Sequence, residues 1–406
     1  MTQAAVLLVI AASLASMMLR PFGVSEAVPV LVGAALLVVF GVLTPFAAVQ
    51  AAGQGVEVYF FLIGMMLLAE LALLQGVFAW AAARLLQRAQ GSAVKLFALI
   101  YTLAVIITVL LSNDATAVVF TPAVAAIAAA AKIAEPLPYL LICAFVANAA
   151  SFVLPISNPA NLVLFGHEMP RLDVWFKLFG LASVLSIIVT YVMLWLTQRR
   201  VVCGTVELPK TMPELTQGGR WTLAGLSGTA VILVLAAWFG WPLGVVTFGL
   251  AVGCLGLVWL LGGQHPRPVL LGVSWSILPL VAGLFIMVGA LDSIGVMSKA
   301  KSFTHEELLP IGAGVALLTN VANNLPIGLL ASHLFPGGAL MRRAVALIGV
   351  DLGPNLSVTG SLATILWMNA LRRQGLSMSG WRFLGLGMVL MPPALLVAIG
   401  GLWLIN

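Results

Sequence analysis

The sequence predicts an all-α polytopic membrane protein that is an inverted repeat of two halves, and three observations lead to this prediction. First, 62% of the 406 residues are hydrophobic and only 8% are charged, whereas about a quarter of the residues in a soluble domain are charged. Second, many apolar segments are long enough to cross a hydrocarbon core of about 30 Å. Third, polar motifs that interrupt the apolar segments of the first half recur in the second half.

The net charge of +6 does not indicate a nucleic-acid partner. The lysines and arginines concentrate between the apolar segments, where basic residues set the orientation of a membrane protein. The expected partner of the apolar surface is therefore the lipid bilayer.

Eight uninterrupted apolar segments are predicted to be transmembrane helices. They cover residues 4–19, 27–44, 57–74, 174–197, 221–239, 243–262, 275–291 and 383–404. The first of them has no basic residue before it and is followed by further apolar segments, so we expect a retained helix and not a cleaved signal peptide.

Four further apolar segments are interrupted near their centres by Asn, Asp, Ser, Thr, Gly or Pro. Residues 94–131 and 309–335 are predicted to form re-entrant helical hairpins, and residues 137–167 and 341–374 are predicted to form broken helices. With the broken helices counted as spans, we expect about ten transmembrane helices plus the two hairpins.

The interruptions recur along the chain. The stretch "LLSNDATA" (110–117) aligns with "LLTNVANN" (317–324), which places Asp114 opposite Val321. A second pair follows, "ANAASFVLPISNPANLVLF" (147–165) and "GVDLGPNLSVTGSLATILW" (349–367). Paired interruptions in two halves are typical of secondary transporters that bind substrate near the midplane of the membrane.

The recurrence divides the chain into two repeats. Residues 1–197 and 221–406 are predicted to be the repeats, and the hydrophilic residues 198–220 are predicted to be a cytoplasmic linker. A weaker echo places Gly64 opposite Gly283.

The basic residues predict the orientation. A cytoplasmic linker places most of the nineteen lysines and arginines in the cytoplasm, as expected for a bacterial-type inner (plasma) membrane protein. Hairpin 94–131 then faces the cytoplasm and hairpin 309–335 faces the periplasm. A topology in which the hairpins span and the broken helices re-enter gives a similar charge bias, so both assignments stay open at this point.

We expect the interruptions to form a substrate site, because broken backbone at membrane depth is tolerated only around protein or a water-filled cavity. No Lys or Arg lies in the breaks, which favours a neutral hydrogen-bonding substrate or a small cation over a polycarboxylate. The predicted substrate-binding residues are Asn113, Thr116, Ser157, Asn158, Asn161, Asn320, Asn323, Asn324, Thr359 and Ser361. The alternative is that these residues only form turns.

Asp114 and Asp351 are the only carboxylates in the breaks. A charge at the centre of a membrane helix costs about 2.5–3.5 kcal/mol, and burial disfavours the ionised form of a carboxylate. Both residues are therefore predicted to carry protons, and the alternative is that each caps a half-helix. Glu57 and Glu70 are interpreted as interfacial or packing residues.

No cofactor, metal site or enzymatic activity is predicted. Cys143, Cys203 and Cys254 are scattered along the chain, which argues against a site built from three thiolates, and the four histidines lack metal-ligand spacing. An intramembrane aspartyl protease would also need two buried aspartates, but Asp351 follows Ile-Gly-Val and not the Gly-x-Gly of that enzyme type.

Several stretches resemble the ArsB-type arsenite and antimonite efflux permeases of the ion transporter superfamily. They are "LLSNDATAVVFTP" (110–122), "PISNPANLVLF" (155–165), "NVANNLP" (320–326) and "GVDLGPNLSVTGSLATILW" (349–367). The last stretch is the most specific, and the resemblance covers nearly the whole chain.

The resemblance implies a secondary active transporter that exports arsenite or antimonite in exchange for protons by alternating access. Arsenite is largely the neutral trihydroxide near neutral pH, which agrees with breaks that contain no cation. Some members of this family engage a cytoplasmic arsenite-stimulated ATPase, and the sequence does not decide whether this chain does. A sodium/proton antiporter and an organic-anion carrier of the same superfamily remain as alternatives.

Overall fold

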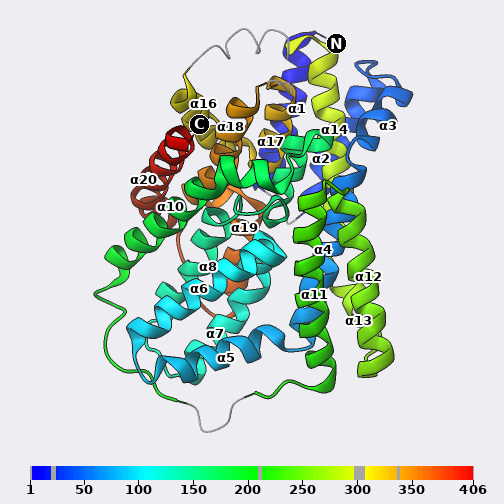
Figure 1. The fold of residues 1–406 in the computed structure, drawn as a ribbon. Coiled ribbons are helices and arrows are strands. Elements are labelled where there is room, and N and C mark those ends of the chain that lie inside the picture. The colour runs from blue at the N-terminus through cyan, green and yellow to red at the C-terminus, as the bar shows by residue number, and fades with distance from the viewer. Residues whose placement is uncertain (1, 20–23, 209–212, 297–306, 336–338, 406) are drawn as a thin grey trace.

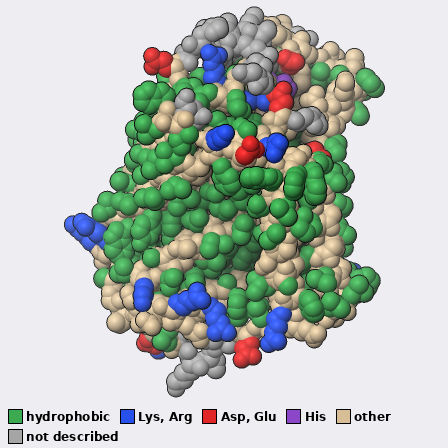
Figure 2. Space-filling view, in the orientation of Figure 1, with side chains coloured by type: hydrophobic (Ala, Val, Ile, Leu, Met, Phe, Trp, Pro, Cys, Tyr) green, Lys and Arg blue, Asp and Glu red, His purple; other side chains and the backbone are tan. Residues whose placement is uncertain are grey.

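The computed structural model describes residues 2–19, 24–208, 213–296, 307–335 and 339–405 (Figure 1). The described residues form helices and no β-strand, which confirms the all-α prediction. In Figure 2 hydrophobic side chains form a broad belt across the visible face, and most charged side chains lie above or below it. This distribution suits a chain that spans a lipid bilayer.

All eight uninterrupted segments form helices. Five of them are long and apolar enough to cross a membrane: α4 (Val56–Leu74), α10 (Leu172–Gln198), α11 (Gln217–Phe239), α12 (Leu243–Gly262) and α20 (Gly380–Ile405). The other three are the shorter α1 (Gln3–Leu19), α2 (Ala27–Val39) and α14 (Ile277–Ser293). α2 ends earlier than predicted because Gly41 adopts a φ of 71°, which stops the helix.

Three shorter helices lie outside the predicted segments. α3 (Pro45–Gly53), α5 (Val77–Ala89) and α13 (Arg267–Gly272) connect the spans. α5 is amphipathic, with Val77, Phe78 and Leu86 buried and Arg84 exposed, so its mixed composition hid it from a search for continuous apolar segments.

The first hairpin consists of α6 (Ala93–Leu111), a π-helical turn (Ala115–Phe120) and α7 (Thr121–Ala130). α6 is itself long and apolar enough to span. It ends at Ser112, whose φ of 87° is incompatible with a helix. The Thr116 hydroxyl then lies 2.8 Å from the Thr108 hydroxyl of α6, so the chain turns back against the helix that it has just left.

The second hairpin consists of α16 (Leu308–Ala322) and α17 (Asn324–Leu334), separated by Asn323. Asn323 has φ 73° and ψ 156°, and Ser112 has φ 87° and ψ 159°. The two residues therefore occupy equivalent places in the repeat.

This equivalence corrects the alignment made from the sequence. The motif alignment placed Thr116 opposite Asn323, whereas the backbone places Ser112 there, one helical turn earlier. Asp114 then corresponds to Leu325, so its carboxylate still has no counterpart in the second half.

The two broken helices also have matching geometry. The first consists of α8 (Leu137–Ala149) and α9 (Pro159–Phe165), and the second of α18 (Leu340–Leu352) and α19 (Leu362–Arg373). Each second part begins after an extended residue that caps it.

These two caps are Asn158 and Ser361. The Asn158 side chain accepts a hydrogen bond from the Ala160 amide at 3.0 Å, and Ser361 accepts one from the Ala363 amide at 3.2 Å. Extended backbone with a side-chain acceptor is the usual start of a helix, so Asn158 and Ser361 are counterparts.

Helices of the two halves pack against each other. α4 of the first half packs against α12 of the second, and α14 of the second half packs against α2 of the first. A Cβ atom on Gly64 would lie 2.8 Å from the Thr247 backbone, and one on Gly283 would lie 2.8 Å from a methyl group of Val30. Matched close approaches at these two glycines support their alignment as repeat counterparts.

The hairpins approach the centre from opposite sides. In Figure 1 α5 and α7 lie at the bottom together with the connection between α10 and α11, whereas α16 and α17 lie at the top. α1 begins and α20 ends at the top as well. This arrangement is the one expected of an inverted repeat.

Candidate functional site

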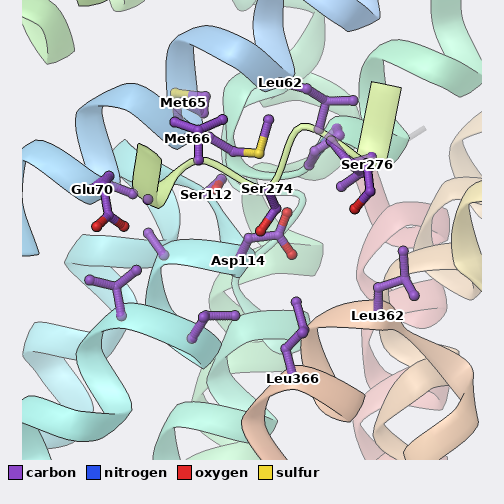
Figure 3. Close-up of a pocket in the computed structure, with 18 of the residues that line it drawn as sticks. Leu62, Met65, Met66, Glu70, Ser112, Asp114, Ser274, Ser276, Leu362 and Leu366 are labelled. Carbon is purple, nitrogen blue, oxygen red and sulfur yellow. The ribbon is translucent and has the colours of Figure 1, made fainter. Parts of the chain in front are cut away.

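A cavity of about 180 Å³ lies beside the tip of the first hairpin (Figure 3). Its walls come from α4, the hairpin tip, the connection between α13 and α14, and α19. The labelled lining residues in Figure 3 are Leu62, Met65, Met66, Glu70, Ser112, Asp114, Ser274, Ser276, Leu362 and Leu366. The cavity therefore joins elements of both halves.

Asp114 projects into this cavity because α6 ends at Ser112. Figure 3 shows its carboxylate pointing toward the segment that carries Ser274. The carboxylate caps no backbone amide and makes no hydrogen bond or ion pair with the described part of the chain. The helix-cap alternative for Asp114 is therefore not realised in this structure.

Ser112 is the second polar group that the hairpin tip supplies. Its side chain is only 3% exposed and lines the cavity. The hydroxyl has no hydrogen-bond partner among the described residues. Because this hydroxyl reaches the cavity and has no protein partner in the described chain, it is available to a ligand.

Glu70 enters the cavity from α4. Gly272 makes room for it, because a Cβ atom at residue 272 would collide with the Glu70 carboxyl group. The interpretation of Glu70 as a packing residue missed this position. The signal in the sequence was a single carboxylate near the end of an apolar segment, which an interfacial residue would also produce.

The cavity has an acidic lining. Glu26, Glu70 and Asp114 contribute carboxyl groups, and no Lys, Arg or His is among the described residues that line it. The remaining wall is apolar apart from serines.

Asp351, the second predicted proton carrier, lies in a different environment. It is fully buried inside α18, so it does not cap the start of a helix. One carboxylate oxygen accepts a hydrogen bond from the Asn158 side chain at 2.7 Å, and the other is buried with no partner among the described residues.

A second polar bridge joins the same two broken helices. Asn148 donates to the Asn355 side chain at 3.0 Å, and Asn355 donates to the Phe145 carbonyl at 3.1 Å. Asp351 and these two amides therefore connect the halves inside the protein core.

The predicted polar residues of the second half contact one another. Asn320 donates to the Gly353 carbonyl at 3.0 Å and accepts from Ser357 at 2.6 Å. Thr359 donates to the Asn320 carbonyl at 2.9 Å, and Asn323 donates to the Thr359 carbonyl at 3.4 Å. These bonds hold the second hairpin tip against the break between α18 and α19.

Most polar residues of the first half satisfy nearby backbone groups. Asn161 donates to the carbonyls of Ser151, Leu154 and Pro155 at 2.9–3.2 Å, and Ser157 donates to the Val109 carbonyl at 3.0 Å. The carbonyl oxygens of the Asn113 and Asn161 side chains are buried without a partner in the described chain.

None of the ten predicted binding residues lines the cavity. Their neighbours Ser112, Asp114, Pro159 and Leu362 line it instead. The first hairpin tip and both broken helices thus reach this cavity, whereas the second hairpin tip, with Asn324, contributes no described lining residue. A direct role of the ten residues in substrate binding stays a prediction.

The cysteines lie apart from this site. Cys143 is buried in α8, Cys254 is buried in α12, and Cys203 is exposed between α10 and α11. Among the described residues no group of three His, Cys, Asp or Glu side chains is arranged to hold a metal ion.

Comparisons with known proteins match this architecture. The profile of the citrate transporter family, CitMHS, matches residues 5–349. An arsenical pump membrane protein of Escherichia coli is 26% identical over 349 residues, which cover 80% of this chain and 81% of that protein. A putative arsenical pump membrane protein of Bacillus subtilis is 23% identical and covers 94% of each chain. These relatives confirm the resemblance to ArsB-type permeases.

A solved structure shares the fold. The YdaH transporter of Alcanivorax borkumensis matches with a TM-score of 0.58 and 15% sequence identity, over 88% of this chain and 87% of that chain. The likeness supports an all-α polytopic transporter fold.

Proposed function

Because the chain belongs to the citrate transporter family CitMHS, it is a membrane transporter, and we propose that it exports arsenite or antimonite in exchange for protons. The observation that carries this proposal is the Asp114 carboxylate, which lines a cavity beside a hairpin tip without a hydrogen-bond partner in the described chain. Several relatives are named arsenical pump membrane proteins, which supports the choice of substrate.

The chemistry of the cavity suits a neutral trihydroxide. Arsenite in this form has O–H groups that can donate to a carboxylate, and the Ser112 hydroxyl can either donate or accept. Neither interaction needs a cationic side chain or a thiolate, so the substrate can exchange rapidly.

A citrate substrate fits this cavity poorly, although the family carries that name. The three acidic lining residues and the absence of Lys, Arg and His among the described lining residues would repel a tricarboxylate. An organic-anion carrier is therefore the weaker alternative.

A sodium/proton antiporter is the second alternative, because carboxylate and hydroxyl oxygens also coordinate hard cations. The two functions differ in what drives transport. A sodium/proton antiporter would transport Na⁺ in exchange for protons and would not transport arsenite.

Proton coupling supplies the energy that export needs. A neutral solute gains nothing from the membrane potential unless a charge moves with it. One proton that enters across 100 mV contributes about 2.3 kcal/mol, which corresponds to a gradient of roughly fiftyfold. A bacterial inner membrane provides such a potential, and an arsenite-stimulated ATPase would be an addition to this cycle and not a requirement.

Everted membrane vesicles provide the test. We expect proton-driven accumulation of arsenite by vesicles that contain the protein, and loss of this accumulation when a protonophore collapses the gradient. Proton-driven uptake of Na⁺ without uptake of arsenite would support the antiporter. Uptake of citrate would support the anion carrier.

A further inference from the structure

We propose that Glu70 and Asp114 form one site at which the substrate and protons compete, so that Glu70 is a second coupling residue. This inference rests on the proposed function and assigns it to particular atoms. It reassigns a residue that the sequence placed among packing groups.

The two carboxyl groups come from different elements. Glu70 lies on α4, whose packing partner α12 belongs to the second half, and Asp114 lies at the tip of the re-entrant hairpin. Both groups line the same cavity of about 180 Å³. A ligand between them would therefore connect a spanning helix to the hairpin tip.

The unpartnered Ser112 hydroxyl indicates that the cavity takes a polar ligand. This side chain is more than nine-tenths buried, lines the cavity and bonds to no described residue. Buried polar groups are normally hydrogen-bonded, so the group is expected to bond to what occupies the cavity. A cavity of this size can hold a molecule of four heavy atoms, since about 30 Å³ suffices for one water.

Competition follows from the hydrogen-bonding capacity of a carboxyl group. An ionised carboxylate only accepts, and it matches the O–H donors of a trihydroxide. A protonated carboxyl group loses part of this acceptor capacity and presents its own donor. Protonation of Glu70 and Asp114 therefore releases the substrate, and binding of the substrate releases protons.

The surrounding charges reinforce this behaviour. Glu26, at the start of α2, is the third acid that faces the pair. Among the described lining residues α9, α14, α19 and the α13–α14 connection contribute no ionisable side chain. No Lys, Arg or His among the described lining residues offsets negative charge on the two carboxyl groups, so bound protons lower its cost.

Arsenite binding measured as a function of pH tests the inference. The protein would be studied as wild type, Glu70→Gln and Asp114→Asn in detergent, at a series of pH values from about 5 to 8. Displacement of each proton changes the affinity by up to about tenfold per pH unit. We expect the wild-type affinity to fall by more than tenfold per pH unit on acidification, and each variant to fall by at most tenfold.

Glu57→Gln is the matched control. Glu57 lies on the same helix, outside the cavity, and accepts a hydrogen bond from the Gly244 amide at 2.8 Å. The glutamine carbonyl can keep this bond, so the variant should show the wild-type pH dependence.

Proton release on binding is the second measurement and needs no variant. Arsenite added to the wild-type protein should release more than one proton per molecule bound at some pH in this range. Release of at most one proton at every pH, or a Glu70→Gln variant with the wild-type pH dependence, would overturn the inference and leave the proposed function standing. A wild-type protein that binds neither arsenite nor antimonite would overturn both.

Discussion

At the scale of single residues, the two buried aspartates differ in what surrounds them. Asp114 faces a cavity without a partner in the described chain, whereas Asp351 accepts from Asn158 inside the core. Only the first arrangement leaves the carboxylate free to meet a ligand. Asp114 is therefore the stronger candidate for proton coupling.

We expect Asp114→Asn to abolish proton-driven arsenite export, because the amide keeps the size of the side chain but does not titrate. A hydrogen bond to a charged group contributes about 1.5–3 kcal/mol, so arsenite affinity should also fall roughly 10- to 100-fold. Asp351→Asn should retain more export, since its asparagine can still accept from Asn158. Transport in everted vesicles measures both variants. Proton-driven export by Asp114→Asn at the wild-type rate would show that this carboxylate does not couple protons.

Replacement of Cys143, Cys203 and Cys254 by alanine or serine should leave arsenite export largely intact. None of the three thiols lines the cavity, and hydroxyl and carboxylate groups exchange an arsenite ligand faster than thiolates. Uptake by vesicles, normalised to the amount of folded protein, is the measurement. Loss of transport by a well-expressed cysteine-free protein would point to a thiol site.

The sequence located the polar residues at the interruptions, and their part in substrate binding stays a prediction. Asn158, Asn320 and Ser361 lie at the predicted interruptions, but their side chains bond to protein groups. A motif gives the position of an asparagine along the chain and not the direction of its amide. Ser112 was missed although it lies inside the motif 110–117, because its neighbours Asn113 and Asp114 were assigned the roles. Glu70 was missed because it lies outside the interrupted segments.

At the scale of secondary structure, one residue with positive φ ends the first helix of each hairpin. Ser112 and Asn323 have nearly the same backbone angles. The sequence predicted both hairpins and both broken helices, because polar residues, Gly and Pro interrupt apolar segments there. It gave the wrong register between the hairpins because "LLSN" and "LLTN" match by letter, whereas the backbone turns one helical turn later in the second hairpin.

Asn323→Val should destabilise the protein, whereas Asn323→Gly should cost less. A β-branched residue strains a backbone with φ of 73°, and such strain costs about 1–3 kcal/mol. Both substitutions remove the hydrogen bond at 3.4 Å from the Leu325 amide to the Asn323 side chain. The difference in stability between the two variants therefore measures the backbone strain alone. Thermal unfolding in detergent compares the two. Identical stability of the variants would show that the tip relaxes away from this conformation.

At the scale of the whole molecule, the inverted repeat brings the two hairpins to the centre from opposite sides (Figure 1). Helices of the two halves pack against each other in the pairs α4–α12 and α14–α2. The sequence predicted the repeat because the interruptions recur. It could not predict which helices of the two halves pack together, since packing between distant segments leaves no local pattern.

The orientation in the membrane can be tested with a natural probe. Cys203 is exposed in the predicted cytoplasmic linker, whereas Cys143 and Cys254 are buried. A membrane-impermeant maleimide should therefore label everted vesicles and leave intact spheroplasts unlabelled, and Cys203→Ala should remove the signal. Labelling of spheroplasts alone would place Cys203 on the periplasmic side, opposite to the prediction.

Coupled movement of arsenite and protons in proteoliposomes tests the proposed function most directly. With purified protein, an outward arsenite gradient should drive protons inward, and an imposed proton gradient should drive arsenite in the opposite direction. Asp114→Asn should show neither movement, and Na⁺ or citrate should not replace arsenite in the wild-type protein. Arsenite flux without proton movement, or proton movement driven by Na⁺ and not by arsenite, would contradict arsenite/proton exchange.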